Sequence, residues 1–418
     1  MSAPTENHQF DAKRLGSARM AVSAAFFANG MMIGHWAPKI PIMVDRLDIS
    51  ERVLGQMIIL LGVGALIALI AGAWLVTRLG SPNVVRWSSI MLAPALVFIT
   101  ITPDALTTAL AMLWLGVFLG GMDNAMNANG VGVEMALEKP VMSSYHGFWS
   151  LGVVFGGLTG GAIIAIAGEM GHALIVMVLA VCLSLWAWPR YLPDAPSFTQ
   201  VDGADENQPK KVVLPKSIGI YILGVATLLG FAPEGTVIDW SALYLKDELG
   251  APVIVSGYAV AAFSATMALM RFRGDGLRAR FGDRMTFIGS GVISALGLLI
   301  AGLAQSVFVA CFGFLIAGLG MANVVPVLFS AAGRYPGIAP AVGIAIVTAF
   351  GYGGLLFIPA FVGLVAEAYS IGLVFTAWAA IVVMVALSGP FLPGIDRVEA
   401  AEPAAEPEAA AIGRGVPD

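Results

Sequence analysis

Charged side chains are scarce in this sequence. They make up 12% of the 418 residues, whereas a soluble globular domain carries roughly 25%. Hydrophobic residues reach 58%, and the mean hydropathy is +0.86. This composition excludes a soluble globular protein and indicates an integral membrane protein.

Cysteine and several chemical motifs are also rare or missing. The two cysteines, Cys182 and Cys311, both lie in apolar stretches, so no disulfide framework is expected. The sequence has no metal-ligand spacing, no GxxxxGK[ST] nucleotide loop and no nucleophile elbow. We therefore expect no cofactor, no metal, no enzyme activity and no ATP-driven transport. The net charge of −5 gives no long-range attraction for nucleic acid.

Long apolar runs are what the sequence has in abundance. A helix crosses a bilayer with about 20 apolar residues, and runs of this length recur along nearly the whole chain. They predict an all-α integral membrane protein with twelve transmembrane helices. The expected spans are 17–38, 54–76, 84–102, 106–134, 144–167, 172–191, 216–241, 252–271, 285–304, 306–332, 338–366 and 370–392.

The distribution of positive charge predicts the orientation in the membrane. With the N-terminus taken as cytoplasmic, eighteen Lys and Arg residues fall on cytoplasmic segments and four on the other side. This bias follows the positive-inside rule and favours two cytoplasmic termini in a bacterial-type inner membrane. Residues 1–16 mix both charge signs before a full-length span, so a polar tail is expected and not a cleaved signal peptide.

The chain divides into two similar halves. We expect a cytoplasmic tail at 1–16, six-helix halves at 17–192 and 216–393, a linker at 193–215 and a disordered acidic tail at 394–418. Matching residues recur at a constant offset of 202 positions. Such repeated halves are typical of secondary transporters, with the solute site between them. The matches are Gly55 with Gly257, Arg78 with Arg280, Gly80 with Gly282, Gly152 with Gly354 and Gly161 with Gly363.

Two loops carry a family resemblance. "AGAWLVTRLGSPNVVR" after the second expected span and "RFRGDGLRARFGDR" after the eighth resemble the basic, glycine-containing loop of the major facilitator superfamily. The first copy has Ala73 where the family commonly has Gly and Thr77 where it commonly has Asp. The resemblance implies a gating role for Arg78, Gly80, Arg280 and Gly282, although these residues also fit a loop that only sets topology.

Three further stretches resemble one branch of that superfamily. "MDNAMNANGVGVE", "SSYHGFWSLGVVFGG" and "EGTVIDWSALYL" are similar to the bacterial sugar and fucose permeases. The resemblance implies that the first, fourth, seventh and tenth spans line a central cavity.

The fourth span carries a polar stripe. Asp123, Asn127 and Glu134 lie within about 40° of one another around a helix. Charged groups inside a membrane usually face a cavity or the bundle interior, and a buried carboxylate can take up and release a proton. We expect both Asp123 and Glu134 to couple protons. The alternative for Asp123 is a hydrogen bond that packs the bundle, and the alternative for Glu134 is a polar residue at the end of the helix. Asn124, Asn127 and Asn323, in the fourth and tenth spans, are candidates for solute binding.

The first and seventh spans supply further candidates. Asn29 and Trp36 would bind solute, although Trp36 also fits an interfacial anchor, and His35 would titrate or form an interhelical hydrogen bond. In "FAPEGTVIDWSALYLK", Glu234 and Asp239 would carry protons, or else form an external gate with Lys39 or Lys246.

The seventh span also predicts a break in its helix. The fifth span carries a candidate gate residue and a group of glycines. Pro233 and Gly235 would interrupt the helix beside Trp240, a further solute-binding candidate. His146 would form a cytoplasmic gate with Glu134. Glycines of the fifth span partly match an antiporter motif of drug exporters, but close helix packing also explains them.

Together these patterns favour a proton-coupled secondary transporter that works by alternating access. Its expected partners are a small polar, sugar-like solute, protons and the lipid bilayer, and it is expected to act as a monomer. The alternatives are a proton-antiport exporter of drugs or metabolites and a membrane sensor on a transporter scaffold.

Overall fold

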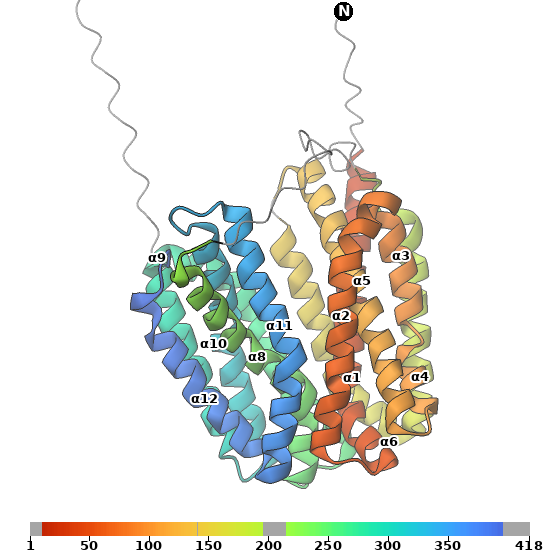
Figure 1. Ribbon diagram of the computed structural model, residues 1–418. Coiled ribbons are helices and arrows are strands. Elements are labelled where there is room, and N and C mark those ends of the chain that lie inside the picture. The colour runs from red at the N-terminus through yellow and green to blue at the C-terminus, as the bar shows by residue number, and fades with distance from the viewer. Residues whose placement is uncertain (1–10, 140, 195–214, 396–418) are drawn as a thin grey trace, which may run out of the picture.

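The computed structural model describes residues 11–139, 141–194 and 215–395, without the side chains at positions 275, 341 and 355. Within these ranges all regular structure is helical (Figure 1). Most of the expected linker at 193–215 and of the tails at 1–16 and 394–418 lies outside the described residues. The described end of the N-terminal tail is already helical, because the Asp11 side chain accepts a hydrogen bond from the Arg14 amide (2.6 Å) and caps the first helix.

Eleven helices account for nearly all of the described chain. Two of them, α3 and α4, form a single crossing that is interrupted at Pro94, since proline has no amide hydrogen to donate. Cys182 and Cys311 are not joined by a disulfide. The helices are α1 (Ala12–Leu47), α2 (Glu51–Leu79), α3 (Ser81–Leu92), α4 (Ala95–Ile101), α5 (Ala105–Leu137), α6 (Met142–Ala187), α8 (Ile218–Asp247), α9 (Tyr258–Gly302), α10 (Val307–Gly333), α11 (Pro340–Ala368) and α12 (Ile371–Leu387).

Helix α6 crosses the bundle twice. It reverses at Gly168, whose φ of 72° and ψ of 175° are readily accessible only to glycine. Before the reversal, the backbone at Val153 packs on Gly34 of α1. After it, His172 lies 3.1 Å from His35, and the carbonyl of Tyr191 accepts a hydrogen bond from Arg14. The second part of α6 therefore runs back along α1.

Helix α9 reverses in the same manner at Gly282 (φ 77°, ψ 164°). Nine segments of the described chain are long and apolar enough to cross a bilayer, and the one that contains α6 makes two crossings. The long but more polar α1 and the 17-residue α12 complete the predicted twelve.

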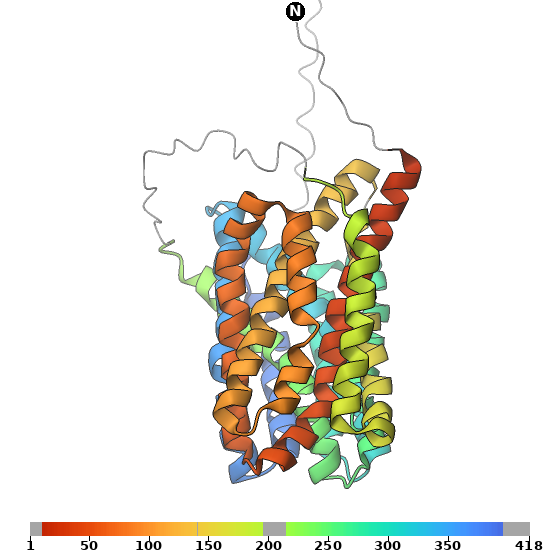
Figure 2. The ribbon, with the colours of Figure 1, turned by 90° about the vertical axis from the view of Figure 1, so that its right-hand side faces the viewer.

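The twelve crossings form two bundles that lie side by side. Figure 1 shows α1–α6 on the right and α8–α12 on the left, and Figure 2 shows the N-terminal half, red to yellow, in front. We call the side that carries the start of α1 the N-terminal face, and the other side the opposite face. An even number of crossings brings both ends of the described chain to the N-terminal face.

Contacts between the halves show the same offset of 202 positions as the sequence. A Cβ atom added to Gly161 of α6 would lie 2.3 Å from the carbonyl oxygen of Val253, and one added to Gly363 of α11 would lie 2.5 Å from that of Glu51. Both glycines and both carbonyls are 202 positions apart. The twofold pseudo-symmetry therefore extends to the backbone atoms of the interface.

A second pair of contacts repeats the relation. Gly257 packs on the backbone of Gly157, and Gly55 packs on the carbonyl of Pro359, again at an offset of 202. The turn glycines Gly80 and Gly282 also share one backbone conformation, with φ of 80° and 77°. Two pseudo-symmetric six-helix halves, as the sequence predicts, are thus present in the structure.

Polar bonds join the halves at the opposite face. Lys246 of α8 binds Asp45 of α1 (2.6 Å), and the Ser50 hydroxyl donates to Glu367 of α11 (2.8 Å). Figure 1 shows α2 and α11 close together at this end and further apart toward the N-terminal face. The two halves therefore meet tightly at the opposite face.

Candidate functional site

A cavity of about 300 Å³ lies between the two halves, among α6, α8, α9 and α10. It begins near the N-terminal face, at Ser143 close to the start of α6 and at Arg278 one turn before Gly282. Because α6 belongs to one half and the other three helices to the second, a solute in this cavity contacts both halves. The lining residues are Ser143, His146, Phe231, Glu234, Met267, Arg271, Gly274, Arg278, Met321, Ala322, Asn323, Val325 and Pro326.

An ion pair stands in the cavity wall. Arg271 Nη2 lies 3.4 Å from Glu234 Oε1, and Arg271 Nη1 lies 3.4 Å from the Ser150 hydroxyl. The guanidinium carbon is 6.0 Å from the centre of the Trp149 ring. Glu234 was a sequence candidate. Arg271 was not, because nothing in its local sequence separates it from the basic loop that follows.

Asn323 and His146 also reach this cavity. The Asn323 amide lies 3.4 Å from the Ser290 hydroxyl and is otherwise directed toward the lining. His146 contacts Phe26 edge to face, with ring centroids 5.1 Å apart. The expected gate between His146 and Glu134 is not formed: Glu134 Oε2 accepts hydrogen bonds from the amides of Val141 (2.6 Å) and Met142 (2.7 Å) and so caps α6.

Helix α8 is continuous, so the predicted break at Pro233 and Gly235 is wrong. One proline removes a single helical hydrogen bond, and the surrounding helices hold the segment in place. The side chain of Glu234 is directed into the cavity by this unbroken helix.

A charge cluster lies beside the cavity near the N-terminal face, and its Arg278 is one of the lining residues. Buried Asp283 binds Arg278 of α9 (2.8 Å) and Arg334 at the end of α10 (2.8 Å), and Arg278 also binds the Ser330 hydroxyl (2.8 Å). This cluster has no signal in the local sequence, since Arg334 lies 51 positions from Asp283.

The residues predicted to gate lie on the same face. Arg78 packs over Trp74 (5.0 Å to the ring centroid) and Arg280 over Phe281 (5.2 Å), and both arginines are exposed. Gly80 and Gly282 form the two turns. The gating role of these four residues stays a prediction.

Only part of the α5 stripe forms as expected. The Asn127 amide donates to the Asp123 carbonyl (2.9 Å) and lies 3.3 Å from Asp123 Oδ1, so these two half-buried residues share a face. Asn124 instead donates to the Ala68 carbonyl of α2 (2.9 Å). Asn124 and the capping residue Glu134 therefore hold helices within the N-terminal half and do not line the cavity.

The α1 candidates are also bound to neighbouring helices. Asn29 donates to the Leu119 carbonyl (3.1 Å) and accepts from the Trp149 indole (2.9 Å). His35 faces His172 in the interior of the N-terminal half, away from the cavity. Neither residue contacts the cavity lining as the sequence analysis expected.

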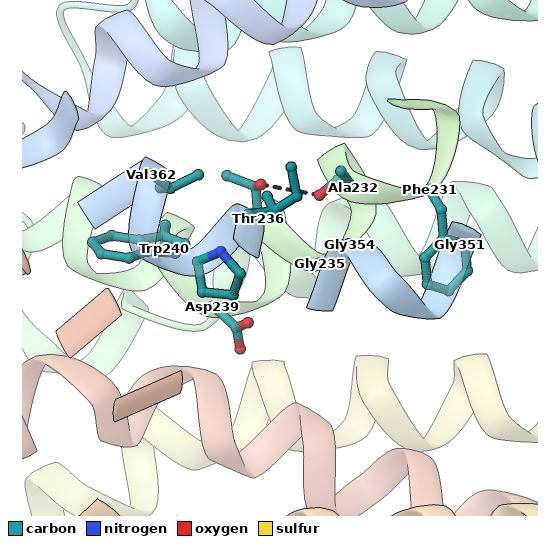
Figure 3. A pocket seen from close by; sticks show the side chains of 11 residues that line it. Phe231, Ala232, Gly235, Thr236, Asp239, Trp240, Gly351, Gly354 and Val362 are labelled. Carbon is teal, nitrogen blue, oxygen red and sulfur yellow. Dashed lines mark hydrogen bonds between the residues drawn. The ribbon is translucent and has the colours of Figure 1, made fainter. Parts of the chain in front are cut away.

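Trp36 and Asp239 form a bond between the halves. The Trp36 indole nitrogen donates to Asp239 Oδ1 (3.0 Å), and Trp36 is fully buried, which rules out a membrane anchor here. Figure 3 shows the Asp239 carboxylate directed toward α1 and away from the Trp240 ring. Asp239 and buried Trp240 border a small cavity of about 40 Å³ between α8 and α11.

The two lysines proposed as gate partners bind other acids. Lys39 Nζ binds Glu169 (2.9 Å), which also contacts Arg46 (3.3 Å), while Lys246 binds Asp45. The expected pairing of either lysine with Glu234 or Asp239 is therefore wrong. The sequence could not distinguish Asp239 from Asp45 and Glu169, because all three contact residues near the same end of the bundle.

A polar cavity between two repeated six-helix halves defines a secondary transporter by its architecture. Relatives from bacteria support this class. The chain is 31% identical to an uncharacterized transporter of Sinorhizobium fredii over 91% of the chain and 99% of that protein. It is 29% identical to an uncharacterized MFS-type transporter of Yersinia pestis over 92% of the chain and 98% of that protein.

The chain belongs to the major facilitator superfamily, whose sequence profile matches residues 219–415. Solved structures share the fold. The nucleoside transporter NupG superposes with a TM-score of 0.70 at 16% identity, over 90% of this chain and 98% of that one. A D-xylose-proton symporter superposes with a TM-score of 0.69 at 15% identity, over 91% and 98%. The protein is thus a transporter and not an enzyme.

Proposed function

We propose that the protein moves a small polar, sugar-like solute or related metabolite together with protons, by alternating access. The observation that carries this proposal is the Glu234–Arg271 pair in a cavity lined by both halves. Charged groups at membrane depth are costly and mark solute or ion pathways. The D-xylose-proton symporter has the same fold, and its name gives one example of such coupling.

The arrangement of the two halves indicates toward which side of the membrane the cavity opens. The halves meet at the opposite face, and the cavity lies toward the N-terminal face. With both termini in the cytoplasm of a bacterial-type cell, as the charge bias favours, this conformation faces inward. The Trp36–Asp239 and Lys246–Asp45 bonds then close the outside.

Carboxylates at three depths supply candidate proton carriers. Among the described residues, Asp123 has no cationic partner, and its side-chain hydrogen bond comes from Asn127 of the same helix. Asp239 accepts the hydrogen bond from Trp36 that joins the halves on the outer side, and Glu234 is paired with Arg271 in the cavity. Protonation of Asp239 would weaken the Trp36 bond and favour outward opening.

The test is uptake into proteoliposomes. Purified protein is reconstituted, and radiolabelled sugars, polyols and sugar acids are offered with the outside at pH 6 and the inside at pH 7.5. We expect accumulation that collapses when a protonophore removes the pH gradient. Accumulation driven only by an acidic interior would show proton antiport and export. Uptake that is indifferent to pH and voltage would rule out proton coupling.

Packing explains the glycines that resemble an exporter motif. A Cβ atom at Gly156 would lie 2.6 Å from the Gly34 carbonyl carbon of α1, and one at Gly160 would lie 2.5 Å from Pro38. Close contact between α1 and α6 thus requires small residues there. These glycines give no independent support to export.

A further inference from the structure

We propose that the solute carries a carboxylate, which replaces Glu234 as the partner of Arg271, and that Glu234 takes up the coupled proton. This inference rests on the proposed transport function and deepens it by naming the class of solute, a hydroxylated carboxylate such as a sugar acid.

Arg271 is held loosely for a half-buried arginine. Its contacts with Glu234 and Ser150 are both 3.4 Å, whereas charge-assisted hydrogen bonds are usually about 2.7–2.9 Å. A guanidinium has five N–H donors in a planar fork that fits a carboxylate with two parallel bonds. The side chain is 24% exposed, so its donors remain accessible to a solute.

The charges of the lining favour an anion. Among the described lining side chains Glu234 is the single acid, while Arg271 and Arg278 are cationic and His146 can become so. Arg278 is bound to Asp283, which leaves Arg271 as the cation nearest to Glu234. A cationic solute would meet these arginines, and a neutral one would leave the Arg271 fork unfilled.

Exchange of partners links the solute to the proton. In the solute-free cavity, the charges of Arg271 and Glu234 cancel. When a solute carboxylate binds Arg271, Glu234 loses its cation, and its side chain is only 10% exposed. The charged form of a buried carboxyl without a cation is disfavoured, so Glu234 binds one proton and the site stays neutral. Solute and proton therefore each favour binding of the other.

Cavity size and polar groups fit a sugar acid. About 300 Å³ is at the lower end of small-molecule pockets. Asn323 and Ser143 of the same lining offer donors and acceptors for hydroxyl groups. His146, Arg278 and the Arg271–Glu234 pair are the titratable or charged groups that the described lining presents to the solute.

Equilibrium binding to the detergent-purified protein tests the inference. The probes are two matched pairs, galacturonate with galactose and gluconate with sorbitol. We expect the two acids to raise the melting temperature and the neutral partners to leave it unchanged. Titration calorimetry in buffers of different ionisation enthalpy should report one proton taken up per acid bound. The dissociation constant should then rise about tenfold per pH unit where Glu234 is ionised in the free protein.

Variants separate the roles of the two residues. Arg271→Gln should weaken binding of both acids at least tenfold. Arg190→Gln, which removes an arginine that follows α6, packs over Trp186 and does not line the cavity, should bind them as the wild type does. Glu234→Gln mimics the protonated acid, so it should bind with a dissociation constant that no longer changes with pH, and without proton uptake.

Several results would overturn the inference. Equal binding of acids and neutral partners, binding that survives Arg271→Gln, or no binding of either acid would each exclude the proposed carboxylate site. Proton uptake that persists in Glu234→Gln but is lost in His146→Gln would move the proton to the histidine. Uptake of a neutral sugar by proteoliposomes would leave the transport proposal standing while this inference fails.

Discussion

The two halves share a scaffold to the level of single backbone contacts, yet they place polar side chains differently. In the N-terminal half, Asn29, His35, Lys39, Asn124 and Glu134 all bond within that half. In the C-terminal half, Glu234 of α8, Arg271 of α9 and Asn323 of α10 face the cavity. A polar residue in a membrane helix of this protein therefore indicates a solute site only when the other helices of its own half do not satisfy its hydrogen bonds.

Asp123 is the informative exception in the N-terminal half. Its described side-chain hydrogen bond comes from Asn127 of the same helix. We expect Asp123→Asn to abolish proton-driven accumulation while the protein still folds, because asparagine keeps the shape and cannot ionise. The measurement is pH-driven uptake in proteoliposomes, with the melting temperature as a folding control. Accumulation at the wild-type level would remove Asp123 from the coupling mechanism and make the contrast between the halves complete.

Pseudo-symmetry predicts that matched glycines at the interface have matched effects. Gly161→Val and Gly363→Val each place atoms against a carbonyl of the other half. Overpacking costs about 1–3 kcal/mol, which lowers the ratio of closed to open protein at the opposite face by roughly five- to 150-fold. The measurement combines each variant with Ser50→Cys and follows labelling of position 50 by a membrane-impermeant maleimide. The extent of labelling should rise by a similar factor in the Gly161→Val and Gly363→Val proteins.

Gly132→Val is the matched control, because a Cβ atom there meets no other atom within 4 Å. Increased labelling in one interface variant alone would show that the two halves do not contribute equally to closure.

An ion pair within the N-terminal half should affect stability and not solute binding. Lys39 is fully buried against Glu169. Loss of one partner of a buried pair costs about 3–5 kcal/mol, and Arg46 remains beside Glu169, so we expect Lys39→Met to fall at the low end. The melting temperature should drop while the affinity for the transported solute is unchanged. A changed affinity would place this cluster in the transport site.

The smallest effect is expected at Asn124. Interhelical hydrogen bonds in membrane proteins contribute on average about 0.6 kcal/mol, so Asn124→Ala should lower the melting temperature only slightly. Solute affinity should stay at the wild-type value, because the amide donates to Ala68 of α2. A marked loss of affinity would restore the solute-binding role that the sequence analysis assigned to this residue.

Much of the fold followed from local sequence. Hydrophobic length predicted twelve crossings, and the constant offset of 202 positions predicted which residues occupy equivalent places. Gly80 and Gly282 were found in this way, and the structure gives them the same turn conformation. Partners were harder to predict. His172, Arg271 and Arg334 lack a local signal, since their roles depend on helices that lie far away in the sequence.

Rotation of each helix decided which neighbour each polar candidate contacts. Asn124 and Asn127 are three positions apart on α5, and this rotation turns one toward α2 while the other stays beside Asp123. Similarly, α8 directs Glu234 into the cavity and Asp239 toward Trp36.

The sequence by itself determined that this chain crosses a membrane twelve times in two repeated halves, because the cost of placing polar backbone in lipid requires long apolar helices. Tertiary structure alone decided which buried polar groups satisfy one another and which are left for a solute. Hydrogen bonds and ion pairs act over a few ångströms, and only the packing of distant helices sets those distances.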